Sequence, residues 1–200
     1  MEARALGRAS PAFAQRGIAE RIGIAVVAIA AVAVSIRAAP GVPGFLGAAL
    51  ALIMLAVAVV DQRRFIIPNE LTAAAAALGI VYAGIAEPDA TAQAIAGAVL
   101  RGAVLALLFL ALRVAYARVR GREGMVLGDV KLAGAGGVWL GWQAIPIAIE
   151  IAALSALAAL ALRHVLGRHR IHATTRLPFG LFLAPAIWLA WLIEVLLDIR

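Results

Sequence analysis

Residues 43–61 read PGFLGAALALIMLAVAVVD, an apolar run that carries no charge until its last residue, Asp61. A transmembrane helix needs about 20 mostly apolar residues, and this stretch comes close to that length by itself. The rest of the chain has the same character: of its 200 residues, 64% are hydrophobic and 14% are charged, and the mean hydropathy is +1.00. A soluble chain of this length could not cover so much apolar surface. The sequence therefore predicts a membrane protein whose solvent is the lipid bilayer.

Apolar runs of this kind recur along the chain, separated by short polar links. They cover residues 22–37, 43–60, 71–86, 92–117, 129–143, 145–162 and 177–197. The pattern predicts an all-α, polytopic transmembrane bundle of about seven spans. Six spans is the alternative, because the first run is short and the fifth is too short to cross the whole bilayer core unless it begins near Met125. We expect a basic tail at residues 1–21 and a single transmembrane domain at residues 22–200.

Basic residues occur in every second link. The N-terminal tail and the links after the second, fourth and sixth runs are rich in arginine, whereas the other links hold few cations. The positive-inside rule places arginine-rich segments in the cytoplasm, so the tail should lie inside and the C-terminus outside. The same rule accounts for the net charge of +7, and no nucleic acid partner is expected.

Two carboxylates are predicted to lie at the same depth in the membrane. Asp61 ends the second run and Asp129 opens the fifth, both at the cytoplasmic boundary. Ionisable residues in spans are costly and indicate a functional site by default. Two neighbouring carboxylates can share a proton, so that one acts as acid and the other as base and water is activated against an amide. The residues alone leave an alternative open, in which Arg63 or Arg64 neutralises Asp61 and Lys131 neutralises Asp129.

The segments around both aspartates resemble the motifs of type IV prepilin peptidases, which are intramembrane aspartic proteases. Residues 61–72, DQRRFIIPNELT, resemble the first motif, in which an aspartate at a helix end is followed by a basic link and Ile-Pro-Asn. Residues 121–132, GREGMVLGDVKL, resemble the second, Gly-x-Gly-Asp followed by Val-Lys-Leu. Residues 137–141 (GVWLG) and 177–180 (LPFG) also match family features, so the resemblance runs from about residue 45 to 195. Asn69 is expected to cap the helix that follows it.

The resemblance implies an aspartic endopeptidase with Asp61 and Asp129 as its catalytic residues. It also implies four residues that bind substrate or shape the site: Pro68, Asn69, Gly128 and Lys131. The implied substrate is a prepilin, cut between its basic leader and its apolar helix at the cytoplasmic face of the bacterial inner membrane, with no cofactor and no metal. Bifunctional family members also N-methylate the pilin and carry an insert with zinc-binding cysteines. This chain has no cysteine and resembles the short, peptidase-only members of tight-adherence (Flp) pilus systems.

One position departs from the second motif. Val126 stands where the family has the first glycine of Gly-x-Gly-Asp. Glycine adopts positive φ readily and valine does not, so the loop before Asp129 is expected to differ in shape, with Gly124 as a partial substitute. A catalytically impaired family member is therefore one alternative.

Two other functions are alternatives to the prepilin peptidase. A presenilin-like protease shares Gly-x-Gly-Asp, but the Ile-Pro-Asn context and the short chain favour the prepilin interpretation. A small ion- or proton-coupled transporter would use Asp61, Asp129 and Arg101 as a relay. Transporters often show paired repeats with interrupted helices, and this sequence shows no internal repeat.

The remaining polar residues carry weaker expectations. Three histidines in an arginine-rich link lack an accompanying carboxylate, so no metal site is expected there; they are His164, His169 and His172. Arg101 falls near the middle of a span, with Glu150 as a candidate partner. Glu194, Trp188 and Trp191 are expected at the outer interface, where indole rings settle.

Overall fold

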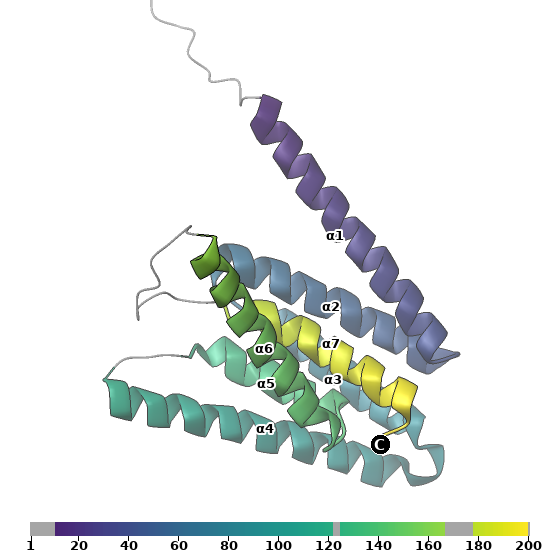
Figure 1. Cartoon of the computed structure of the whole chain (residues 1–200). Coiled ribbons are helices and arrows are strands. Elements are labelled where there is room, and N and C mark those ends of the chain that lie inside the picture. Colours follow the sequence, from purple (N-terminus) through teal and green to yellow (C-terminus); the bar gives the residue numbers. More distant parts are fainter. Residues whose placement is uncertain (1–10, 122–124, 167–177, 200) are drawn as a thin grey trace, which may run out of the picture.

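The computed structural model describes residues 11–121, 125–166 and 178–199, and these ranges form helices and no strand (Figure 1). The helices are α1 (Pro11–Ala38), α2 (Val42–Arg64), α3 (Asn69–Ala86), α4 (Thr91–Arg120), α5 (Leu127–Trp139), α6 (Ala144–Val165) and α7 (Gly180–Leu197), with a 3-10 turn at Pro88–Ala90. The all-α prediction is confirmed, and every predicted apolar run corresponds to one helix. The largest difference is at α1, which begins well before residue 22.

Within the described ranges, six of the helices are long and apolar enough to cross a membrane: α1, α2, α3, α4, α6 and α7. The exception is α5, which has 13 residues. At 1.5 Å per residue it is about 20 Å long, less than the ~30 Å of a bilayer core. The protein is therefore a multi-pass membrane bundle in which α5 is too short to cross by itself.

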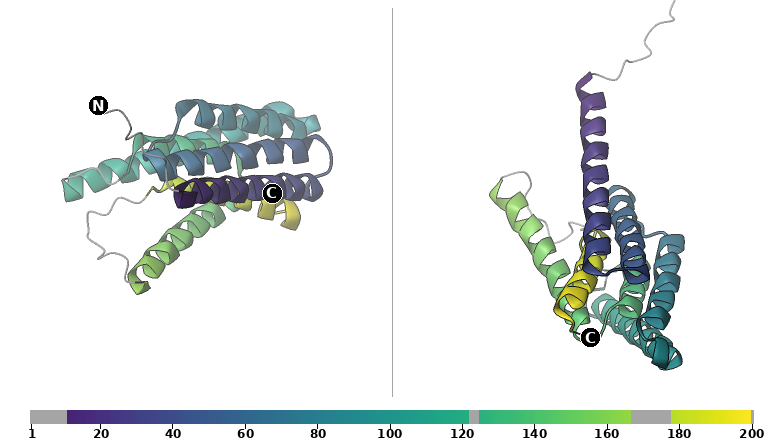
Figure 2. Two further views of the ribbon diagram at one scale, coloured as in Figure 1. Left: turned by 90° about the horizontal axis from the view of Figure 1, so that it is seen from above. Right: turned by 90° about the vertical axis from the view of Figure 1, so that its right-hand side faces the viewer.

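Helices α2 to α7 form the bundle, and α1 diverges from it (Figure 2). α5 contacts α3, α4 and α7, and α7 also contacts α2 and α6. The C-terminal part of α1 lies beside α2, and the N-terminal part of α1 points away from the bundle. Only 6% of the most apolar stretch of α1 is buried inside the protein. The rest of α1 presents apolar side chains that suit a lipid environment.

Glycines bring α5 into backbone contact with its neighbours. A Cβ atom on Gly137 would lie 2.7 Å from the backbone oxygen of Arg101 in α4. A Cβ on Gly136, on another face of α5, would lie 2.9 Å from Cδ1 of Ile187 in α7. Small residues at transmembrane helix interfaces allow such close approach. The short helix is therefore fitted tightly between spans.

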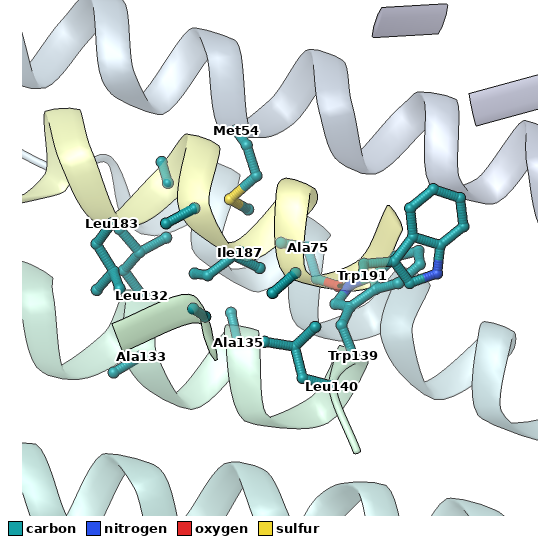
Figure 3. Packing of buried hydrophobic residues seen from close by; sticks show 14 of the residues in the cluster. Met54, Ala75, Leu132, Ala133, Ala135, Trp139, Leu140, Leu183, Ile187 and Trp191 are labelled. Carbon is teal, nitrogen blue, oxygen red and sulfur yellow. Dashed lines mark hydrogen bonds between the residues drawn. The ribbon is translucent and has the colours of Figure 1, made fainter. Parts of the chain in front are cut away.

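Large side chains of α2, α5 and α7 fill the centre of the bundle (Figure 3). Met54, Leu132 and Ile187 are almost completely buried. Trp139 of α5 donates a hydrogen bond from Nε1 to the backbone oxygen of Ala75 in α3, at 2.7 Å. This bond joins α5 to α3 through a side chain that is itself part of the core.

The placement of Trp191 and Glu194 at the outer membrane interface stays a prediction, but both side chains are buried among the helices. Trp191 is fully buried and packs edge-on against Trp139, with ring centroids 6.4 Å apart. Glu194 is 5% exposed. Trp188 is half-buried and donates from Nε1 to Ser35 Oγ at 3.0 Å. One face of the C-terminal half of α7 therefore packs inside the bundle, whereas Leu196 and Leu197 at its end are exposed.

Replacing Gly137 with alanine tests the backbone contact. Gly137→Ala should lower the free energy of unfolding by about 1–3 kcal/mol, because the backbone of α4 cannot move aside for the added methyl group. Gly23→Ala is the matched control, since nothing lies within 4 Å of that position in α1 and alanine is the better helix former. Thermal unfolding in detergent measures the stability of both variants. An equal change in the two variants would contradict the contact between Gly137 and the backbone of Arg101.

The cysteine-free sequence makes single introduced cysteines reliable reporters of sidedness. Val119→Cys, at the exposed end of α4, should react with an impermeant maleimide from the cytoplasmic side. Trp142→Cys, in the exposed turn between α5 and α6, should react from the opposite side. Reaction of both cysteines from one side would refute the alternating arrangement of basic links.

Candidate active site

The carboxylate of Asp61, near the end of α2, lies at the N-terminus of α7. The backbone N–H of Leu181 donates to Asp61 Oδ2 at 2.9 Å. The first N–H groups of a helix have no partner within the helix and carry partial positive charge, so they favour an anion. Gly180 makes room for this contact, because a Cβ there would lie 2.8 Å from Asp61 Oδ2. The first turn of α7 is thus built around the Asp61 side chain.

Asp129 lies in the first turn of α5. Its Oδ2 accepts a hydrogen bond from the backbone N–H of Val126 at 3.3 Å, and its own N–H donates to the Val126 oxygen at 3.1 Å. An acidic residue in the first turn also suits the helix dipole. Asp129 and Asp61 are each 5% exposed. Both carboxylates are therefore buried, and each is held at a helix N-terminus.

The two aspartate segments meet around Ile67. A Cβ on Gly128 would lie 2.9 Å from Ile67 Cβ, and a Cβ on Gly180 would lie 2.7 Å from Ile67 Cδ1. Gly128 precedes Asp129, and Gly180 adjoins Asp61. Asp61 is near enough to Asp129 for the two carboxylates to repel each other when both are ionised. The structure thus brings the two sequence-predicted aspartates into one site, with Ile67 packed between the two glycines.

Ile67, Gly180 and Leu181 belong to this site although the sequence did not single them out for it. Ile67 and Gly180 both lie in segments quoted for their resemblance to family motifs, which is the only signal they gave. Their task depends on contacts between segments far apart in the sequence. Leu181 contributes its backbone N–H, a group that every residue except proline carries, so no sequence pattern could have identified it.

The link between α2 and α3 does not have the expected cap. α2 ends at Arg64 and is followed by Phe65 in the left-handed conformation (φ 54°). The N–H of Phe65 donates to the backbone oxygen of Asp61 at 2.9 Å. Pro68, in extended conformation, is the residue before α3, and no side chain caps that helix. The prediction that Asn69 caps it is wrong. Asn69 Oδ1 instead accepts a hydrogen bond from Lys131 Nζ at 2.7 Å, which joins α3 to α5.

The neutralisation alternative assigned a neighbouring cation to each aspartate. Arg63 instead pairs with Glu20 of α1 at 2.7 Å. Arg64 is exposed, and Lys131 donates to Asn69. These contacts favour the interpretation in which the two carboxylates form a pair.

Val126 does not distort the start of α5. Its backbone is extended (φ −85°, ψ 150°), a conformation that valine adopts without strain. Its side chain is exposed. The backbone at Val126 therefore does not support the expected change in loop shape. Gly124 lies outside the described residues.

The described ranges contain no group of three or more His, Asp or Glu side chains that could hold a metal ion. His164 lies in the last turn of α6. His169 and His172 lie outside the described residues.

Comparison with known proteins identifies the family of the chain. The type IV leader peptidase family matches residues 48–162. A prepilin leader peptidase/N-methyltransferase of Aeromonas hydrophila is 32% identical over 165 residues, which are 82% of this chain and 55% of that protein. The leader peptidase HopD of Escherichia coli is 30% identical over 126 residues, 63% of this chain and 78% of HopD. No solved structure gives a significant match.

The fold and the site define a multi-pass membrane protein with a buried pair of carboxylates at one end of its bundle. The chain belongs to the type IV leader peptidase family. The chain spans about half the length of the Aeromonas hydrophila relative, with 55% of that protein covered.

Replacing Val126 tests whether valine strains the start of α5. Val126→Gly should give no gain in stability and a loss of up to about 1 kcal/mol, because glycine adds freedom to the unfolded chain and the native φ already suits valine. Thermal unfolding in detergent is the measurement. A clear rise in the unfolding temperature would show that valine is strained here.

Proposed function

We propose that this protein is an aspartic endopeptidase that removes the leader from a prepilin, with Asp61 and Asp129 as its catalytic residues. The observation that carries the proposal is a pair of buried carboxylates, one from each of two motifs, in a single site. The names of the relatives, prepilin leader peptidase and leader peptidase, support the substrate class. No cofactor is needed for this chemistry.

The proposed reaction uses one proton held between the two carboxylates. The ionised aspartate takes a proton from water as the water oxygen attacks the carbonyl carbon, and the protonated aspartate gives its proton to the carbonyl oxygen. The tetrahedral intermediate then collapses and the C–N bond breaks. The leaving amine takes the proton that the first aspartate gained from water, and a hydroxyl of the intermediate returns a proton to the second aspartate as the product carboxyl group forms. The nucleophile is water, so no covalent bond to the enzyme forms. The shared proton belongs to the pair rather than to either residue.

The residues around the pair are proposed to shape the site. The hydrogen bond between Lys131 and Asn69 holds the start of α5 against the start of α3. Gly128 leaves space for Ile67, and Pro68 ends the link with a fixed φ. Each of these contacts bears on where the two motif segments lie, and so on the distance between the carboxylates.

The pair is proposed to face the cytoplasm from the bacterial inner membrane. Basic residues end α2 and α4 at the same end of the bundle as the aspartates, and such residues stay on the cytoplasmic side. A basic prepilin leader would stay on that side for the same reason. The bond between the leader and the apolar helix would then lie at the level of the aspartates.

We also propose that the protein is a peptidase of the Flp type without N-methyltransferase activity, although the Aeromonas hydrophila relative is named for both activities. The support is the cysteine-free sequence, because the bifunctional proteins that it resembles use zinc-binding cysteines. Incubation with an Flp-type prepilin and a radiolabelled methyl donor tests this directly. Cleaved pilin should carry no label, and labelled pilin would contradict the proposal.

Removing either carboxylate should abolish cleavage. Asp61→Asn and Asp129→Asn keep the size of the side chain but cannot hold or take the proton, so each should slow cleavage by about 10²- to 10⁴-fold. The measurement is cleavage of a purified prepilin at matched membrane levels of the protein. Asp89→Asn, an exposed carboxylate in the 3-10 turn, is the control and should cleave at the normal rate. Near-normal cleavage by either active-site variant would refute the pair.

A further inference from the structure

An arginine and a glutamate hold the carboxyl end of α5. Arg101 of α4 donates from Nε to the backbone oxygen of Leu140 at 2.7 Å. Glu194 of α7 accepts from the backbone N–H of Gly141, at 3.2 Å to Oε1 and 3.1 Å to Oε2. Glu194 is also the carboxylate whose charge acts on Arg101. The expected partner, Glu150, is exposed on α6, and that expectation is wrong.

These contacts meet a requirement that the short helix creates. The last carbonyl groups of a helix have no partner within the helix, and a buried carbonyl group needs a partner from elsewhere in the protein. α5 ends within the bundle, where Leu140 is 1% exposed. Charged side chains from two spans therefore bind the backbone at the point where α5 stops. Ionisable residues inside spans are costly, which indicates that holding this point matters.

The pair lies at the opposite end of α5 from Asp129. Arg101 and Glu194 line a cavity of about 540 Å³, together with Trp142 and Gln143 of the turn after α5. Asp129 lies in the first turn of α5, and the pair binds the backbone just after the last residue of α5. Any effect of the pair on the aspartates must therefore pass through the helices.

We propose that Arg101 and Glu194 are positioning residues that fix α5 and thereby set where Asp129 lies relative to Asp61. The pair joins the two helices that hold the carboxylates: α5 carries Asp129, and the N-terminus of α7, the helix of Glu194, binds Asp61 through Leu181. The effect on cleavage rests on the proposed function. The effect on the position of α5 does not.

A distance measurement without substrate tests the positioning role. In this cysteine-free chain, spin labels at Leu127→Cys, the first residue of α5, and Phe45→Cys, exposed on α2, report where α5 lies. Arg101→Gln removes the positive charge beside the buried Glu194, and Glu194→Gln removes the negative charge beside the half-buried Arg101. We expect the distance distribution to shift or broaden in both. The double variant removes both charges, so its distance distribution should return part of the way to that of the unchanged protein.

Two controls separate positioning from general effects. Glu150→Gln removes an exposed carboxylate from α6, and Ala148→Gly weakens a buried position of α6, which packs on α7. Neither should change the label distance, although Ala148→Gly should lower the unfolding temperature. A shift of equal size in either control would overturn the proposal. If a neutral variant fails to fold, Arg101→Lys keeps the charge but loses the planar donor geometry, and a smaller shift is expected.

Cleavage by the unlabelled variants separates the two claims. Each single variant should lower kcat about tenfold to a hundredfold, with a smaller change in KM, because a misplaced carboxylate slows the chemical step. Unchanged distances in both single variants overturn the positioning role, whatever happens to cleavage. Shifted distances with full cleavage keep the positioning role and contradict the catalytic pair instead.

Discussion

The arrangement depends on how the backbone of α5 is held, because a 13-residue helix cannot anchor itself across a bilayer. α4 supports it at three places. The Arg101 backbone oxygen lies against Gly137, the Arg101 side chain binds the Leu140 oxygen, and Arg113 Nε donates to the Met125 oxygen just before α5 begins, at 3.0 Å. A single long span therefore contacts α5 at both ends and along one face.

α5 carries Asp129, and the N-terminus of α7 binds the carboxylate of Asp61 from α2. Each aspartate lies at a helix N-terminus, where partial positive charge favours an anion. Their burial opposes ionisation, and so does their mutual repulsion. A pair under these opposing influences can hold one proton between two carboxylates, which is the state that acid and base catalysis at a peptide bond requires. The glycines around Ile67 allow the three segments to pack closely together.

The sequence predicted the helices well, because run length and hydropathy report on each span separately. Alternating charge placed Asp61 and Asp129 at one level, and the structure brings them together. The errors concern partners far apart in the chain. The sequence predicts Asn69 as a helix cap, but its Oδ1 accepts a hydrogen bond from Lys131 in α5. Hydropathy also does not predict the packing of Trp191, because it does not show which helices surround an indole ring.

The most direct test of the account is whether Asp61 and Asp129 act as one unit. Single-turnover cleavage of a prepilin, with enzyme in excess, gives the residual rates of Asp61→Asn, Asp129→Asn and the double variant. If the carboxylates share one proton in one reaction, the double variant should be no slower than the slower single variant, because either change already removes the whole function. Rate losses that multiply in the double variant would show two independent contributions and would contradict the account.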